Sequence, residues 1–161
     1  MMGEADTMNP FWQFSLSLYE EPGVSGYCID LQDRHGVMVN LLLFCCWLGV
    51  HCRSLGKRHV QEIEQLVQQY NVEVIQALRA RRRQGLSGDA AKELMEKELQ
   101  AEREEQDRLY EWFTCVDLPM TSCCDNLVAK NLQYYLEGFN GVFTRPALLI
   151  AAASRINCRA L

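Results

Sequence analysis

An almost unbroken apolar run from Val37 to Val50 is the strongest constraint on the fold. Asn40 is the one polar side chain within it. A helix of this run is apolar nearly all round, and such a helix belongs in a protein core because a surface helix keeps a polar face. A helix that crosses a bilayer needs about 20 apolar residues, so this run is too short to span one. We therefore predict a buried central helix and no membrane span.

The composition favours helix over strand along the rest of the chain. The 161 residues include only four prolines and ten glycines, and the many Leu, Gln, Glu, Arg and Ala side chains lose little rotamer freedom in a helix. We predict an all-α fold, a compact single-domain bundle of roughly six to eight helices. The domain is expected to cover residues 9–155, between a flexible N-terminus at residues 1–8 and a frayed tail at residues 156–161.

Capping and turn residues place the individual helices. Asn9 followed by Pro10 is a typical helix start, because the side chain caps the first turn and proline fits the first helical position. Asn71 can divide a long helical segment, and Ser87 or Asp89 can cap the helix that follows. After the first helix, we predict helical segments over residues 24–35, 37–51, 57–84, 89–113, 125–137 and 142–157.

The N-terminal segment has no basic region followed by an apolar one, so we expect no secretory signal peptide and a cytoplasmic location. In that compartment the eight cysteines are expected to stay thiols, without disulfides. Cys45 and Cys46 point about 100° apart on a helix, so they cannot both readily face one ion, and the chain has no Cys-x-x-Cys motif. We predict no metal site and no cofactor.

Charge is divided into two neighbouring blocks. Residues 53–84 carry seven bases and three acids, and residues 85–113 carry four bases and nine acids. Such blocks either pair with each other across a helical hairpin or present a patch to a partner. We favour pairing within the chain.

Asn40 needs polar neighbours, because a buried side-chain amide without hydrogen bonds costs about 1–3 kcal/mol. The predicted helix over residues 89–113 supplies them, since Glu102 and Gln106 interrupt its apolar face. We predict a buried polar network of Asn40, Glu102, Arg103 and Gln106, with Arg103 or another base neutralising the carboxylate. The network fixes helix register or forms the floor of a small-ligand site, and we favour the first interpretation. The apolar face itself is predicted to contain Met95, Leu99, Leu109 and Phe113.

Arg79, Arg81, Arg82 and Arg83 form a candidate basic patch at the end of the fourth helical segment. They could contact phosphate or RNA. Nucleic-acid binding usually requires a broader basic surface, and this chain has a net charge of −5. We therefore expect these arginines to pair with the acidic helix or with a partner protein.

An ordered string of residues in the N-terminal third resembles a known family. It comprises the segments 9–16, 22–24, 31–33 and 39–48 together with Tyr19. This string is similar to a family of small uncharacterised proteobacterial proteins that contain a domain of unknown function, and residues 78–83, 98–103 and 131–134 resemble it more loosely. The resemblance implies a bacterial, cytoplasmic, helical protein and supplies no activity. Met38 stands where an acidic residue is expected in the family, so any role of that carboxylate is absent here.

The sequence contains no recognisable catalytic motif, so we assign no catalytic residue and lean against an enzyme. We expect a protein–protein interaction or regulatory module, whose partner and oligomeric state the sequence does not indicate. One alternative is a small-ligand-binding protein or enzyme with a polar pocket around Asn40 and Glu102. The other is phosphate or RNA contact through Arg79 to Arg83.

Overall fold

The computed structural model describes residues 9–122, 126–139 and 146–159. Within these ranges the chain forms eight α-helices and one π-helical segment, and an isolated β-bridge joins Arg53 to Met120. The elements are α1 (Pro10–Glu20), α2 (Val24–His35), α3 (Val39–Val50), α4 (Lys57–Tyr70), the π-helical segment η1 (Asn71–Gln76), α5 (Ala77–Arg82), α6 (Asp89–Cys115), α7 (Asn126–Leu136) and α8 (Ala147–Arg159). The prediction of an all-α bundle is confirmed.

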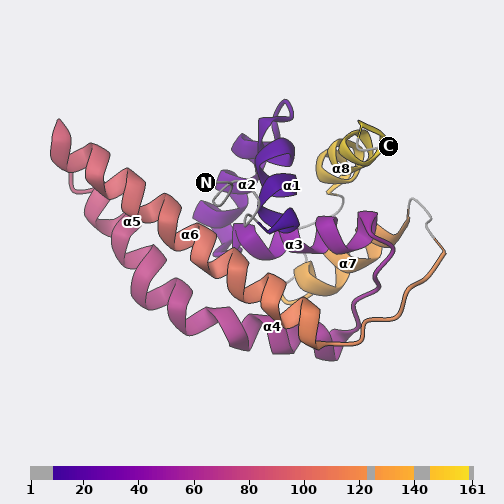
Figure 1. The fold of residues 1–161 in the computed structure, drawn as a ribbon. Helices are drawn as coiled ribbons and strands as arrows, with labels where there is room; N and C mark the ends of the chain where they lie inside the picture. Colours follow the sequence, from indigo (N-terminus) through magenta and orange to yellow (C-terminus); the bar gives the residue numbers. More distant parts are fainter. Residues whose placement is uncertain (1–8, 123–125, 140–145, 160–161) are drawn as a thin grey trace, which may run out of the picture.

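Helix α3 forms the centre of the bundle, as its apolar sequence predicts. Every residue from Asn40 to Gly49 is buried, and α3 contacts α1, α2, α6, α7 and α8 (Figure 1). The most extensive of these contacts is with α7. The two helices approach so closely that a Cβ atom on Gly49 would lie 2.6 to 2.8 Å from atoms of Val128. No helix in the described ranges has the length and apolar character that a membrane span requires.

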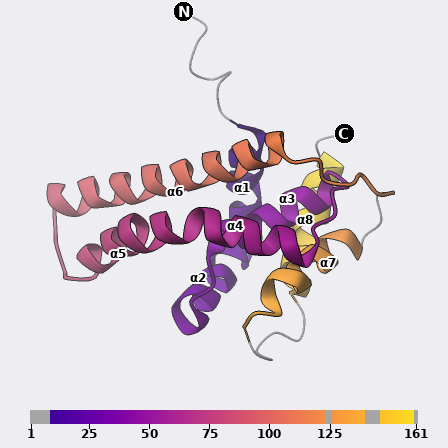
Figure 2. The same cartoon turned by 90° about the horizontal axis from the view of Figure 1, so that it is seen from below.

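A long helical hairpin extends from one side of the bundle (Figures 1 and 2). Helix α4, η1 and α5 form one limb and pack against α6, the other limb. We call its outer part, residues 77–95, the arm. No residue of α5 is buried, and Leu94 is the one buried residue of α6 within the arm.

The predicted apolar face of α6 is wrong at its N-terminal end. Met95 is 61% exposed and Leu99 is 53% exposed, whereas Leu109 is fully buried. The spacing of these side chains suits a helix face, but burial also requires a neighbouring element to cover that face. Near the arm, α6 contacts the other limb of the hairpin and leaves these two side chains uncovered.

Several predicted boundaries are confirmed and others shift. Asn9 caps α1 as expected, because its side chain accepts a hydrogen bond from the Trp12 amide at 2.7 Å. The predicted side-chain caps of α6 are wrong: the N-cap is Gly88, which makes no side-chain hydrogen bond and has a φ of +69°. Helix α8 ends at Arg159, beyond the expected helix end at residue 157. The expected flexible segment at residues 1–8 and the end of the expected tail, residues 160–161, lie outside the described residues.

The five cysteines whose side chains the structure describes are three buried thiols, one exposed thiol and one disulfide-bonded residue. Cys28, Cys45 and Cys46 are free and buried, and Cys115 is free and exposed. Burial raises the pKa of Cys28 to about 12 and raises the pKa of Cys45 and Cys46 well above the usual thiol range, which makes all three poor nucleophiles. Cys52 is disulfide-bonded, so the prediction of thiols throughout is wrong. That prediction rested on redox compartment, which does not say which thiols a fold brings together.

Candidate functional site

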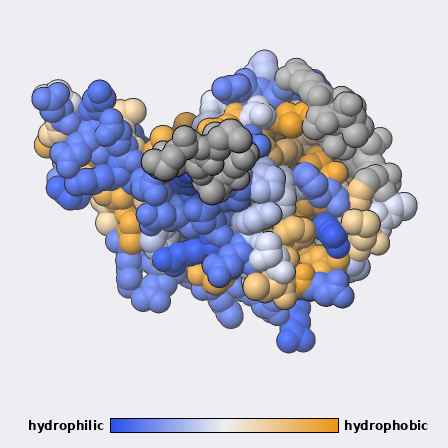
Figure 3. Space-filling view, in the orientation of Figure 1, coloured by the Kyte–Doolittle hydropathy of each residue, from blue (hydrophilic) through white to orange (hydrophobic). Residues whose placement is uncertain are grey.

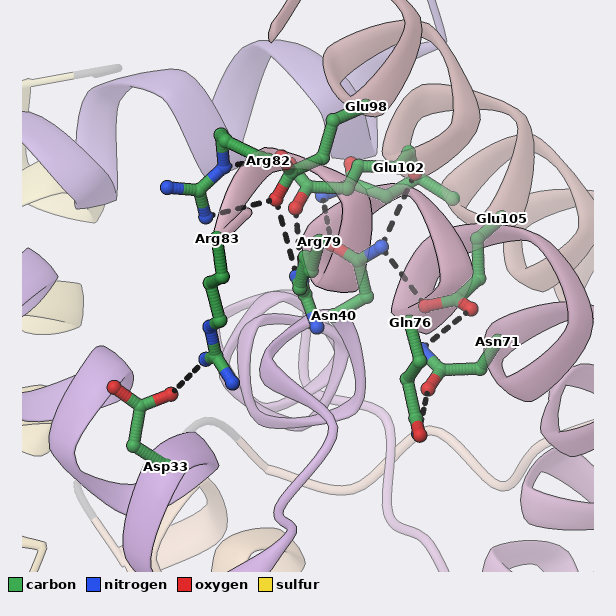
Figure 4. Close-up of polar contacts among 11 residues, drawn as sticks. Asp33, Asn40, Asn71, Gln76, Arg79, Arg82, Arg83, Glu98, Glu102 and Glu105 are labelled. Carbon is green, nitrogen blue, oxygen red and sulfur yellow. Dashed lines mark hydrogen bonds and ion pairs between the residues drawn. The ribbon is translucent and has the colours of Figure 1, made fainter. Parts of the chain in front are cut away.

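A buried hydrogen-bond network joins α3 to α6. The Gln106 side chain donates from Nε2 to Asn40 Oδ1 at 2.9 Å. Asn40 in turn donates from Nδ2 to Glu105 Oε1 at 3.0 Å and to the carbonyl oxygen of Glu102 at 3.1 Å (Figure 4). The polar side chain that interrupts the apolar sequence of α3 is therefore satisfied entirely by one segment of α6.

A second chain of hydrogen bonds reaches the same carboxylate from η1. Gln76 Nε2 donates to Asn71 Oδ1 at 2.9 Å, and Asn71 Nδ2 donates to Glu105 Oε2 at 3.0 Å. Asn71 is the first residue of the π-helical segment and is buried there together with Ile75. π-Helical turns are rare and are frequent at functional sites. Here the π-helical turn contains Asn71, whose side-chain amide donates the second hydrogen bond to the Glu105 carboxyl group.

Glu105 is a buried carboxylate held by two amides. Desolvation raises its pKa, and the hydrogen bonds from Asn71 and Asn40 and the nearby charge of Arg79 partly offset that rise. The described residues provide no ion-pair partner for it. Among these residues, Glu105 is therefore held by side-chain amides alone, without a directly bound cation.

The candidate basic patch is largely neutralised by carboxylates. Arg79 contacts Glu98 at 3.2 Å through Nε and Glu102 at 2.9 Å through Nη2. Arg82 contacts Glu98 at 2.8 Å. Arg83 reaches α2, where it contacts Asp33 at 2.9 Å, and Arg81 is exposed (Figure 4). The basic and acidic blocks of the sequence thus pair across the hairpin.

A cavity of about 150 Å³ lies above this network, between α1, α3 and α6. Its lining is partly apolar, through Leu16, Val39, Leu43 and Leu99, and partly polar, through residues that include Asn40, Asn71, Arg79, Glu102, Glu105 and Gln106. Two of its lining residues carry a buried polar atom without a hydrogen-bond partner among the described residues: Ser15 Oγ and Gln106 Oε1. Ser15 is 4% exposed and Gln106 is 1% exposed. Two residues of the lining thus carry a buried polar atom whose hydrogen-bonding capacity is unused.

Two further hollows of about 330 Å³ and 280 Å³ adjoin this cavity, and Gln32 and Arg79 line all three. Arg79 is held in place by its two ion pairs. Its side chain is therefore a fixed element that the three linings share.

The structure brings together three of the four residues predicted for the polar network. Asn40 and Gln106 are hydrogen-bonded through their side chains, whereas Glu102 meets Asn40 through its backbone carbonyl. The fourth, Arg103, lies over the Trp12 ring, with its guanidinium carbon 5.7 Å from the ring centre. The base beside Glu102 is Arg79, and although burial raises the pKa of Glu102, Arg79 opposes that rise.

Sequence reasoning missed Glu105, Asn71 and Ser15. The signal for Glu105 was present, because it follows Glu102 by three residues and so shares its helix face. The position of Asn71 depends on the π-helical segment, which no sequence pattern here indicated. Within the described residues, no group of three or more His, Cys, Asp or Glu side chains could hold a metal ion.

Comparison with known proteins identifies a family but no activity. The chain matches no curated protein and no solved structure. The family described as "Protein of unknown function (DUF2390)" matches residues 10–109, a range that contains the network and the cavity lining from Trp12 to Gln106. The proteobacterial origin and the motif string described above stay predictions. Because the match covers more than half of the chain, the protein belongs to the DUF2390 family of proteins of unknown function.

Proposed function

We propose that this protein binds a small organic ligand in the cavity between α1, α3 and α6. The observation that carries the proposal is the pair of unpartnered atoms, Ser15 Oγ and Gln106 Oε1, in residues of the cavity lining. A buried polar atom without a hydrogen bond costs about 1–3 kcal/mol. A ligand that supplies the missing bonds recovers that cost and gains affinity from it.

The size and character of the cavity support the same function. A cavity of about 150 Å³ is large enough to bind benzene, so this one suits a ligand with a body of that size. Small-molecule sites are typically apolar with a few fixed polar groups. The hydrogen-bond chains that end at Glu105 fix the polar groups here, and Leu43 and Val39 provide apolar surface. The proposal includes no catalytic step.

Phosphate or RNA contact through Arg79 to Arg83 has weaker support. Arg79, Arg82 and Arg83 are each paired with a carboxylate. An anionic ligand would have to displace those carboxylates before it could bind.

Replacing Leu16 by tryptophan is expected to abolish ligand binding. Leu16 lines the cavity and is 44% exposed, so it lies at the opening, where an indole can block entry without being forced into the core. The measurement is native mass spectrometry of protein purified gently from its natural host, followed by release and identification of any bound small molecule. We expect at least a tenfold loss of the bound species in Leu16→Trp.

Leu66→Trp is the matched control, because Leu66 is similarly exposed on α4 and lines none of the three cavities described above. It should retain the ligand. The proposal is wrong if the wild-type protein carries no small molecule under these conditions, or if Leu16→Trp retains as much of it as Leu66→Trp does.

A protein partner bound to the arm is a second candidate function, favoured by exposed apolar side chains. Met95 and Leu86 on the arm and Leu99 just beyond it are all exposed, although much of the arm surface is hydrophilic (Figure 3). Apolar side chains that gather on a surface commonly mark interaction sites. We expect Met95→Asp to reduce a specifically co-purifying protein at least tenfold, while Val72→Asp, at an exposed position on η1, leaves it unchanged. Equal recovery with both variants would remove this candidate.

A further inference from the structure

We infer that the ligand of this cavity is a small organic cation, an amine or guanidine with an apolar body about the size of benzene. The inference rests on the proposed function, since it names the chemical class of ligand for the same site. Charge balance, hydrogen-bond polarity and the shape of the lining each point to this class.

Carboxylates outnumber cations around the cavity. Glu102 and Glu105 line it with Arg79 as the one cationic residue of the lining, and the guanidinium of Arg79 is already bound to Glu98 and Glu102. The wider cluster contains three paired arginines and four acids: Arg79, Arg82 and Arg83 with Asp33, Glu98, Glu102 and Glu105. Glu105 is the carboxyl group of this cluster that only amides contact.

The hydrogen-bond polarity of the lining favours a donor. Asn40 uses both Nδ2 protons on acceptors of α6, and Gln106 uses Nε2 on Asn40. Two groups of these lining residues make no hydrogen bond with another described residue. One is Gln106 Oε1, which can only accept, and the other is the Ser15 hydroxyl, which can accept or donate. A ligand with several N–H groups matches these atoms, whereas a carboxylate or phosphate finds at most one donor among them.

The cost of burying a cation is met by the charge already present. An ion transferred into a protein interior loses several kcal/mol of hydration unless an opposite charge and hydrogen bonds replace the water. Glu105 supplies that charge from the network, and its position is fixed by Asn40 and Asn71. The apolar side chains Leu43 and Leu99 then face the hydrocarbon part of the ligand.

Three probes of one shape and different charge test this inference: benzylamine, benzyl alcohol and benzoate. Isothermal titration calorimetry at pH 7 is expected to show benzylamine binding at least tenfold more tightly than benzyl alcohol, and no binding of benzoate. Leu16→Trp should abolish the benzylamine signal, and Leu66→Trp should leave it unchanged. Ser15→Ala should weaken benzylamine binding severalfold while raising the resistance of the protein to urea, because the variant removes a buried hydroxyl without a partner.

The outcomes separate this inference from the proposed function. Equal affinity for benzylamine and benzyl alcohol, with both lost in Leu16→Trp, leaves the small-ligand site intact and overturns the cationic class. Tighter binding of benzoate also overturns it. If none of the probes binds, the cationic inference is overturned, and the native mass spectrometry described above decides separately whether the cavity holds another ligand.

Discussion

Replacing Asn40 by leucine is expected to lower the free energy of unfolding by about 3 kcal/mol at pH 7. Leucine fills a similar volume but leaves two buried groups of α6 without their partner, Gln106 Nε2 and Glu105 Oε1. One of these belongs to the carboxyl group of Glu105, and hydrogen bonds to groups that carry a charge are the most costly to lose. Urea-induced unfolding measures the change. Gln76→Leu is the control, because Gln76 is the exposed outer member of the network and should cost less than about 1 kcal/mol.

The cost of Asn40→Leu should fall as the pH is lowered from 7 to 5. The hydrogen bond from Asn40 lowers the pKa of Glu105, so its removal raises that pKa further above the ordinary value of 4.5. A carboxyl whose pKa is raised in the folded protein binds its proton more tightly there than in the unfolded chain. Its contribution to stability therefore increases as the pH falls through the folded pKa towards 4.5. Because the pKa of Glu105 is higher in the variant, lowering the pH stabilises the variant more than the wild type. An equal cost of the substitution at both pH values would show that Glu105 is not the group left unpaired.

Gly49→Ala is expected to destabilise the protein by about 2–3 kcal/mol, although alanine favours helix over glycine by about 1 kcal/mol. The added Cβ would lie 2.7 Å from the Cα and 2.8 Å from the backbone nitrogen of Val128, so one helix must move. Helices α3 and α7 share the most extensive contact in the bundle, and a shift there disturbs the whole core. Thermal and urea unfolding measure the change.

Gly26→Ala provides the control of opposite sign. Gly26 lies within α2 and a Cβ there would meet nothing within 4 Å. The variant should be more stable than the wild type by about 0.5–1 kcal/mol. If both glycine variants gain stability, α3 and α7 do not pack at the distance described here.

The sequence predicted the elements whose causes are local. Pro10 after Asn9 sets the start of α1, and the apolar run after Asn40 sets a central helix, because capping and amphipathic pattern act within one helix. The requirement that Asn40 find polar partners also follows from its own residue type. Gln106 was predictable as one of those partners because it interrupts an apolar helix face.

The rest depends on how separate elements meet. Arg79 on α5 pairs with Glu102 on α6, whereas Arg103, the residue after Glu102, lies over the ring of Trp12. The contact of Asn71 with Glu105 depends on the π-helical segment, and the exposure of Met95 depends on a covering element that is missing from the described part of the chain. Such relations are properties of the assembled bundle, and residue spacing does not contain them.

For a ligand bound as proposed above, we expect the arm to govern how quickly the cavity exchanges it. With Leu94 as its one buried residue, the arm can open at a free energy far below that of global unfolding, because local opening costs little where few apolar contacts are lost. Such opening would withdraw Arg79 from the cavity lining, whereas the α3–α7 contact lies outside the arm. We therefore expect the ion pairs of Arg79 with Glu98 and Glu102 to hold the arm closed, and their strength to set the residence time of the proposed ligand.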